Sequence, residues 1–367
     1  MPQITFYPIG NADTTLIELV DGRLILKDFC HTEVDDNRPS LRDEISDRLS
    51  ELDRDMIDIV AFSHADSDHV SGADEFFYFD HAKKYQDDDR IKIGELHLPA
   101  TFLTETGLKG AARIISAEAK HRLEEGERVK IYSSPEQLGD KYDPDNALYQ
   151  HAGSCLEGIT KDNGGAEIFV HSPLTYIVEE DGSERNGNSI VWHITFFEGD
   201  SPCRLILGAD AIQETLVEIV KRTVANDNED RLTYDLFRIP HHCSYLSLSA
   251  EKGTDETIPR DEIKDLYQMG NSNAILISSS NPIPSNADDA QPPHRQAAAF
   301  YKRIAREKGD ESNFLVTMDW PPGGDAPSPI VVNIDKNCMT VQKDIAKHGG
   351  VAFVTERQSG RMGKQWK

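Results

Sequence analysis

The stretch His64-Ala65-Asp66-Ser67-Asp68-His69 decides how this chain is interpreted. It follows the apolar run 57–62 and precedes Val70-Ser71-Gly72, so we expect it between the end of a buried strand and a helix. Four of its six side chains can bind a metal ion, which indicates a metal site. Side chains alternate along a strand end, so the first histidine and both aspartates are expected on one side. The turn into the helix brings the second histidine from the other side. Two ions could share such a cluster.

Asp66 and Asp68 also have a simpler interpretation. Short acidic side chains are common at helix N-termini, where they accept hydrogen bonds from backbone N–H groups. Capping does not account for the two histidines that bracket both aspartates. The pattern therefore favours a metal site.

Composition indicates a soluble protein. The 367 residues contain no apolar stretch long enough to span a membrane, and the N-terminus lacks the basic and apolar parts of a signal peptide. We expect a cytoplasmic location without membrane contact. The five cysteines are odd in number, widely spaced and without a Cys-x-x-Cys pair, so we expect reduced thiols at Cys30, Cys155, Cys203, Cys243 and Cys338.

The formal net charge of −25 limits the partners. An acidic surface repels duplex nucleic acid and anionic membranes unless a local basic patch overrides the repulsion. The segment 357–367 is the concentrated basic candidate, and we expect it to be a solvated end. A moderately salt-adapted source would also explain the acidity.

Hydrophobic periodicity predicts strands that alternate with amphipathic helices. The expected strands are 4–7, 14–20, 23–27, 57–62, 91–98, 168–171, 189–197, 204–207, 236–239, 274–278, 314–318, 330–334 and 339–341. The expected helices are 40–52, 72–79, 110–123, 212–220 and 293–307. Such short strands suit an α/β fold of two sheets packed face to face with helices outside, a four-layer αββα sandwich. We expect one domain over 1–345, with a long loop or insertion at 133–165 and a tail at 346–367.

Several motifs together resemble a known family. The cluster at 64–69 resembles the His-x-His-x-Asp-His signature of the metallo-β-lactamase superfamily. The order of the other motifs is similar to the competence-protein (ComEC-type) branch, over roughly residues 3 to 341: Gly10-Asn11-Ala12-Asp13, Asp28, Asn188-Ser189-Ile190-Val191, Leu205 to Asp210, Ile239 to Ser244 and Pro292-Pro293-His294. The chain departs from the pattern at Asp66, which replaces a histidine, and at Cys30 and Cys243, which replace glycines. No channel segment accompanies these motifs, so DNA uptake is not implied.

The resemblance implies two metal half-sites. Asp68 and His69 would hold one ion, Asp210 would bridge or cap the pair, and either His241 or His242 would complete that half. The other half would use His64 and Asp66, and its third ligand stays open between His97 and His171.

Other motif residues would support these ligands. Asp28 and Asp13 would orient them, although ordinary turn capping is the alternative. His294 and Ser244 would contact the substrate, although His294 could simply begin a helix. His193 alternates within an apolar strand, so we expect it in the core.

The implied chemistry is hydrolysis by a metal-bound hydroxide, with Asp68 and Asp210 as catalytic groups. Asp68 could pass the proton to the leaving group. We expect one or two divalent ions, zinc or manganese, with iron or magnesium also compatible. Asp66 is a harder ligand than a histidine, so it would shift the metal preference of its half-site away from zinc. It could also bind an ion too weakly for that half-site to be occupied.

The expected activity is that of a phosphodiesterase or nuclease, since the ComEC-type branch is associated with that chemistry. The same metal pair also serves carbonyl chemistry, so a hydrolase of another ester, lactone or thioester is an alternative. A metal-binding partner subunit with reduced activity is a third interpretation. The charge favours a small molecule or a nucleic-acid end as substrate, and a protein partner from the same system is compatible with the motifs.

Overall fold

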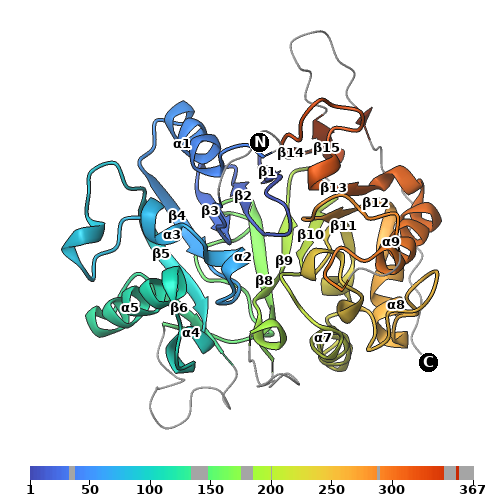
Figure 1. The fold of residues 1–367 in the computed structure, drawn as a ribbon, viewed down its shortest axis with the longest axis horizontal. Coiled ribbons are helices and arrows are strands. Elements are labelled where there is room, and N and C mark those ends of the chain that lie inside the picture. Colours follow the sequence, from blue (N-terminus) through green and yellow to red (C-terminus); the bar gives the residue numbers. More distant parts are fainter. Residues whose placement is uncertain are drawn as a thin grey trace.

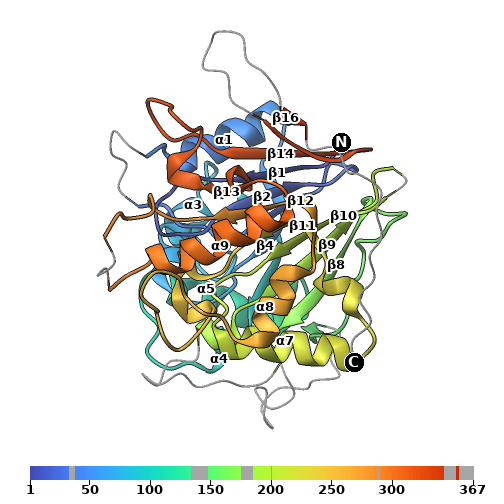
Figure 2. The same ribbon diagram turned by 90° about the vertical axis from the view of Figure 1, so that its right-hand side faces the viewer.

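Two β-sheets pack face to face in the centre of the molecule (Figures 1 and 2). The computed structural model describes residues 1–32, 38–133, 148–174, 185–199, 201–286, 290–342 and 353–354. The larger sheet has ten strands in the spatial order β16 (Phe353–Val354), β15 (Cys338–Gln342), β14 (Ile330–Asp335), β1 (Gln3–Phe6), β2 (Thr15–Glu18), β3 (Leu24–Lys27), β4 (Met56–Ala61), β5 (Lys92–Pro99), β6 (Val129–Tyr132) and β7 (Tyr149–Gln150). The smaller sheet has six, in the order β13 (Phe314–Val316), β12 (Gly270–Ser278), β11 (Tyr234–Arg238), β10 (Cys203–Leu207), β9 (Val191–Phe196) and β8 (Ala166–Ser172).

Helices cover both outer faces of this pair of sheets (Figure 1). The larger sheet carries α1 (Leu41–Glu51), α3 (Ala73–Phe76) and α5 (Gly110–Glu125), and the smaller carries α7 (Gln213–Ala225), α8 (Asp261–Gln268) and α9 (Arg295–Lys308). The shorter helices are α2 (Ser67–Val70), α4 (Thr101–Thr104), η1 (Lys83–Tyr85), η3 (Asn186–Asn188), η4 (Glu229–Leu232), η5 (His241–Cys243), η6 (Tyr245–Ser247), η7 (Glu311–Asn313) and η8 (Thr317–Asp319).

Among the described residues, three apolar cores hold the layers together. Alternation along β3 shows how: Leu24 and Leu26 belong to the core beneath α1 and α5, whereas Ile25 belongs to the core between the sheets. Trp192 of β9 reaches the same central core from the other sheet. The third core lies between the smaller sheet and its helices, with Tyr267 of α8 among its members. The predicted four-layer αββα sandwich is confirmed.

Parallel strands direct the chain toward one edge of each sheet. In the larger sheet, β3, β4, β5 and β6 run parallel, and in the smaller sheet β10, β11, β12 and β13 do so. The carboxyl ends of neighbouring parallel strands lie at a common edge, where loops collect functional residues. The cluster 64–69 follows β4, and Asp210 follows β10.

Some predicted boundaries were wrong. The helix expected at 72–79 ends at Phe76, because Phe77 turns extended and pairs with Ile91. Helix α8 and strands β6 and β7 were not predicted. Within the expected loop 133–165, residues 134–147 lie outside the described residues, as does most of the expected tail 346–367.

The expectation of reduced thiols was wrong for one pair. Cys203 of β10 and Cys338 of β15 form a disulfide that joins the two sheets, with their Cα atoms 5.0 Å apart. They are separated by 135 residues in sequence, so spacing gave no sign of the pairing. Cys30, Cys155 and Cys243 are free thiols.

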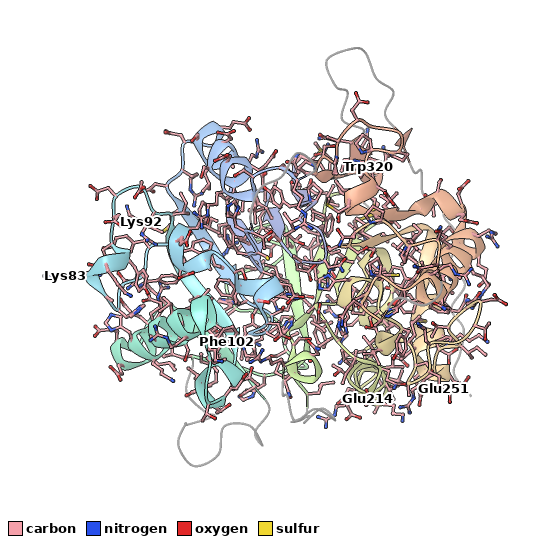
Figure 3. The ribbon with its side chains drawn as sticks, viewed as in Figure 1. Lys83, Lys92, Phe102, Glu214, Glu251 and Trp320 are labelled. Carbon is pink, nitrogen blue, oxygen red and sulfur yellow. A yellow bond between two sulfur atoms is a disulfide. The ribbon has the colours of Figure 1, made fainter. Side chains whose placement is uncertain are left out.

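Charged side chains occupy the periphery of both halves. Lys83, Lys92, Glu214 and Glu251 are exposed, and Figure 3 labels them at the margins of the molecule. No helix of the described residues has the length and apolarity needed to cross a bilayer. The cytoplasmic location stays a prediction.

Candidate metal centre

The cluster 64–69 occupies the junction between β4 and α2. Asp66 stands at the N-cap position of α2, but its side chain makes no capping hydrogen bond. Asp68 and His69 lie within the single turn of α2, and His69 is fully buried. The capping interpretation is therefore not what the structure shows for Asp66, whose carboxylate is directed to other partners.

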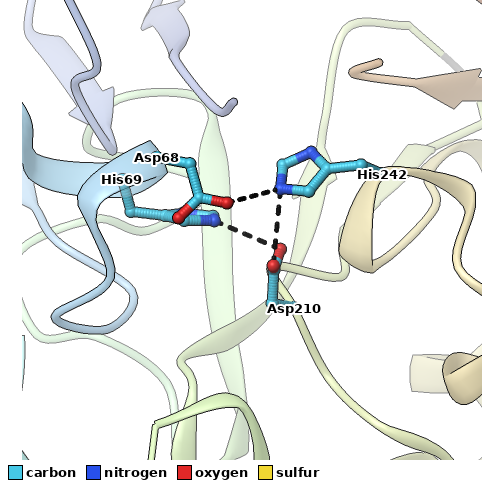
Figure 4. A group of neighbouring side chains, drawn as sticks. All are labelled: Asp68, His69, Asp210 and His242. Atoms are coloured by element: carbon cyan, nitrogen blue, oxygen red, sulfur yellow. Dashed lines mark hydrogen bonds and ion pairs between the residues drawn. The ribbon is translucent and has the colours of Figure 1, made fainter. Parts of the chain in front are cut away.

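Four side chains from three segments converge on one point (Figure 4). Asp68, His69, Asp210 and His242 each offer a ligand atom, and these atoms all lie within 4.8 Å of one another. His242 Nε2 lies 3.1 Å from Asp68 Oδ2 and 3.4 Å from Asp210 Oδ2, and His69 Nε2 lies 3.2 Å from Asp210 Oδ1. Two imidazoles and two carboxylates at this spacing form a donor set suited to a divalent transition metal.

The backbone of η5 selects which of two adjacent histidines joins this group. His241, His242 and Cys243 all have left-handed φ values, at 52°, 49° and 65°. Such values cost non-glycine residues roughly 1–3 kcal/mol each, and they persist where surrounding contacts impose them. His241 N donates to Ala209 O at 2.9 Å, which ties η5 to the loop that carries Asp210. This turn brings His242 into the donor group and leaves His241 outside it.

Neighbouring groups fix the orientation of both histidine rings. His242 Nδ1 donates to the carbonyl oxygen of Ser279 at 2.8 Å, which turns Nε2 toward the two aspartates. His69 Nδ1 lies 3.1 Å from Asp28 Oδ2, so its Nε2 likewise points toward Asp210. Hydrogen bonds to the distal ring nitrogen orient metal-bound histidines in this way.

Two buried ligand atoms face each other at the centre. His69 Nε2 and Asp210 Oδ1 lie 3.2 Å apart, and neither has another hydrogen-bond partner among the described residues. His69 Nδ1 faces Asp28, so an ion bound at Nε2 would take the place of the proton there. A divalent cation satisfies such an arrangement, so the residues present fit a metal ion.

The charges around the centre also favour a bound cation. Asp13 is ion-paired with Arg238, and Asp28 lies 3.6 Å from Lys27 Nζ. Burial alone would raise the pKa of Asp28, but Lys27 and His69 outweigh it and lower the pKa to about 2. Both outer carboxylates therefore have cationic partners.

Imidazoles lie beside the two inner carboxylates, Asp68 and Asp210. Burial acts to lower the pKa of His69, and the charges of Asp210, Asp28 and Asp68 outweigh it and raise the pKa well above its usual value. A region that stabilises a proton on a buried imidazole is strongly negative. A divalent ion would be stabilised there by the same carboxylates.

His64, Asp66 and Asp68 form a second, smaller group. Their ligand atoms also lie within 4.8 Å of one another, and His64 Nε2 is 3.5 Å from Asp66 Oδ2. Ser63 Oγ lies 3.0 Å from His64 Nδ1 and 3.2 Å from His69 Nδ1, so one hydroxyl contacts both histidines of the cluster. Arg185 is ion-paired with Asp66 beside this group.

The expected third ligand is not found at either candidate position. Both ring nitrogens of His97 are engaged, Nδ1 with Tyr132 Oη at 2.9 Å and Nε2 with Glu95 Oε2 at 2.7 Å. His171 Nε2 donates to Arg231 O at 2.9 Å. Neither histidine belongs to a donor group of the described residues, because strand-end position alone does not bring a side chain to the edge where the ligands meet.

The remaining candidates lie near η5 and in the core. Ser244 Oγ accepts a hydrogen bond from Leu246 N at 3.3 Å and so caps η6. His294 is buried at the start of α9 and packs edge-on against Tyr245. His193 is buried and contacts Thr233 O at 3.1 Å, as its strand position predicted.

Sequence reasoning missed several residues around the centre. Arg238 is a charged residue at the end of the apolar strand β11, and Lys27 immediately precedes Asp28. A buried cation in an apolar strand is a readable signal of a buried anion nearby. Ser279 acts through its backbone carbonyl and has no signal in side-chain chemistry, whereas Arg185 lies in sequence without distinctive periodicity.

Comparison with known proteins gave similarities among solved structures. The chain matches none of the protein-family models and none of the curated proteins with which it was compared. The metallo-beta-lactamase fold protein YhfI from Bacillus subtilis is 10% identical, with 90% of this chain and 99% of that one covered and a TM-score of 0.39. Unliganded yeast PDE1 is 11% identical, with 86% and 96% covered and a TM-score of 0.44.

A third similar structure is Igni18, a metallo hydrolase from the hyperthermophilic archaeon Ignicoccus hospitalis KIN4/I. It is 12% identical, with 91% of this chain and 99% of that one covered and a TM-score of 0.36. At these identities and scores, the fold assignment rests on the layers and cores described above, and the site rests on its own geometry.

Proposed function

We propose that this protein is a metal-dependent hydrolase of phosphodiester bonds. The observation that carries the proposal is the pre-oriented donor set of Asp68, His69, Asp210 and His242, in which Asp68 is partly exposed and the other three are buried. The motif order that resembles the ComEC-type branch of the metallo-β-lactamase superfamily supports the choice of phosphodiester chemistry.

The four donors would hold one divalent ion, zinc or manganese. When bound, such an ion acidifies a water to near neutral pH and neutralises charge on phosphoryl oxygens. Asp210 is 3% exposed, whereas the side chain of Asp68 is 34% exposed. Asp68 is therefore the member of the set that can exchange a proton with a leaving group at the solvent side.

A cavity of about 490 Å³ opens beside the segment that follows Ser279. Its wall includes Arg38, Trp320 and Asn281, which lies two residues beyond the Ser279 carbonyl that orients His242. Asn281 N also donates to Asn11 Oδ1 at 2.9 Å. The metal donors are not part of the lining. Its volume suits a small molecule.

The charge of −25 supports a small substrate or a nucleic-acid end over a long duplex. A protein partner from the same system stays a prediction. In that case this protein would supply the hydrolytic activity of the system, as the ComEC-type motifs suggest.

A substrate panel tests the proposal. Chelated protein is reloaded with manganese or zinc and assayed with an activated phosphodiester, a carboxylic ester, a lactone and a thioester. We expect turnover of the phosphodiester, its loss in Asp210→Asn, and full retention in the exposed control Asp255→Asn. Preferential turnover of the carbonyl substrates would overturn the phosphodiester assignment, and the absence of metal binding would overturn the hydrolase itself.

A further inference from the structure

Arg185 joins two acidic residues at the edge of the metal centre. Its Nη1 is ion-paired with Asp66 Oδ1, and its Nη2 lies 2.6 Å from Glu105 Oε1. Arg185 Nε also donates to Glu105, at 3.1 Å and 3.2 Å from the two carboxylate oxygens. Asp66 precedes α2, Glu105 follows α4 and Arg185 precedes η3, so three separate segments fix the guanidinium.

The same carboxylate belongs to the smaller donor group. Asp66 uses Oδ1 for Arg185, while its Oδ2 lies 3.5 Å from His64 Nε2. An ion bound by His64, Asp66 and Asp68 would therefore share Asp66 with a guanidinium cation. Two positive charges competing for one carboxylate repel each other, and an arginine cannot lose its charge by deprotonation.

We propose that Arg185 takes the place of a second metal ion, so that the centre binds one divalent ion tightly. The ion is held by Asp68, His69, Asp210 and His242, and the guanidinium supplies the second positive charge for the substrate phosphate. This inference rests on the proposed function, and it specifies how that site recognises its anionic substrate.

The geometry leaves Arg185 able to contact a substrate. Its contacts with described residues use three of the five N–H donors of a guanidinium. The side chain is 31% exposed, so the remaining donors can reach a ligand. Arginine is well suited to phosphate because its planar fork matches two oxygens at once.

The pairing also gives a reason for Asp66 in place of the histidine of the family signature. A carboxylate carries the negative charge that an ion pair with a guanidinium needs. A neutral imidazole at this position could bind a metal but could not form that ion pair. Asp66 and Arg185 then act as a matched pair, with Glu105 holding the guanidinium from its other side.

Metal counting tests the proposal without reference to activity. Chelated protein is titrated with manganese and with zinc by calorimetry, and the ions retained per chain are measured after gel filtration. We expect one ion per wild-type chain and two in Arg185→Gln, where Asp66 becomes free to bind. Arg185→Lys keeps the charge and should retain one ion. Arg222→Gln removes a guanidinium that pairs with Glu218 on α7 and should also retain one ion.

The outcomes separate the two proposals. Two tightly bound ions in the wild-type protein, or a single ion in folded Arg185→Gln, would overturn the role of Arg185 and leave the hydrolase intact. No bound ion in any protein would overturn the proposed function. Glu105→Gln, which retains Arg185 but weakens its fixation, provides a second variant should Arg185→Gln fail to fold. There we expect a second ion to bind measurably, whereas the wild-type chain retains one.

Kinetics adds an independent readout. With an activated phosphodiester we expect Arg185→Gln to raise KM by about 10-fold or more, because a charge-assisted contact to the phosphate is lost. Arg185→Lys should recover part of this loss, and Arg222→Gln should show none. An unchanged KM in Arg185→Gln would show that the guanidinium does not contact the substrate.

Discussion

Asp28 Oδ2 lies 3.1 Å from His69 Nδ1, and both side chains are buried. The carboxylate fixes the proton on Nδ1 and so leaves Nε2 available at the centre. Asp28 itself has a left-handed φ of 60° at the end of β3, which aims its side chain at α2. Metal affinity should therefore depend on a residue that does not itself belong to the four-donor group.

Asp28→Asn tests this dependence. An amide can present its NH₂ group to Nδ1 and favour the wrong tautomer of His69, so we expect divalent-ion affinity to fall by about 10–100-fold. Calorimetric titration of chelated protein measures the change. The exposed Asp162→Asn is the matched control, and equal affinity in both variants would remove the orienting role of Asp28.

His69→Ala and Asp210→Ala should each reduce hydrolysis to background and leave no tightly bound ion. Each removes a donor from the four-residue group and so removes both affinity and positioning. Metal content and turnover are measured on the same samples. His121→Ala, on α5, should change neither quantity. Undiminished turnover by purified Asp210→Ala would contradict the assigned centre.

Because His171 is buried, we expect the folded protein to lose stability in mild acid. Burial lowers its pKa from 6.5 to about 4. Below pH 6.5 the unfolded chain binds a proton at this residue that the folded chain does not, so the free energy of unfolding falls as the pH drops from 6.5 towards 4. The full contribution is roughly 3 kcal/mol.

Urea unfolding of wild-type protein and His171→Gln at pH 7 and pH 4.5 measures this effect. The variant should lose less stability than wild type between the two pH values, because glutamine does not titrate. Parallel losses in both proteins would assign the acid sensitivity to other groups.

The disulfide between Cys203 and Cys338 should stabilise the contact between the two sheets. Closing a loop of this length lowers the entropy of the unfolded chain, and we expect its removal to cost about 2–5 kcal/mol. Thermal melts of Cys203→Ser against the free-thiol control Cys155→Ser measure the difference. Peptide mapping without reductant should recover the crosslinked pair, and recovery of five alkylated thiols from native protein would refute it.

Local sequence was sufficient to predict the layers of this fold. Leu24, Ile25 and Leu26 show why: alternate side chains of one strand enter different cores, and this periodicity is visible without any tertiary contact. Short elements were harder to predict, since helix α3 ends where Phe77 pairs with Ile91. That pairing is a contact between separate segments, and it overrides the local helical pattern.

The sequence by itself determined where the candidate ligands would be, because His64 to His69 bring metal-binding chemistry together within a single turn of chain. Only the tertiary structure decided that His242 joins the donor group while His241 does not, through consecutive left-handed residues held by Ala209. It likewise decided that Asp66 meets Arg185, 119 residues away. These outcomes depend on distances between remote segments, and such distances are set by the packing of the two sheets and not by local sequence.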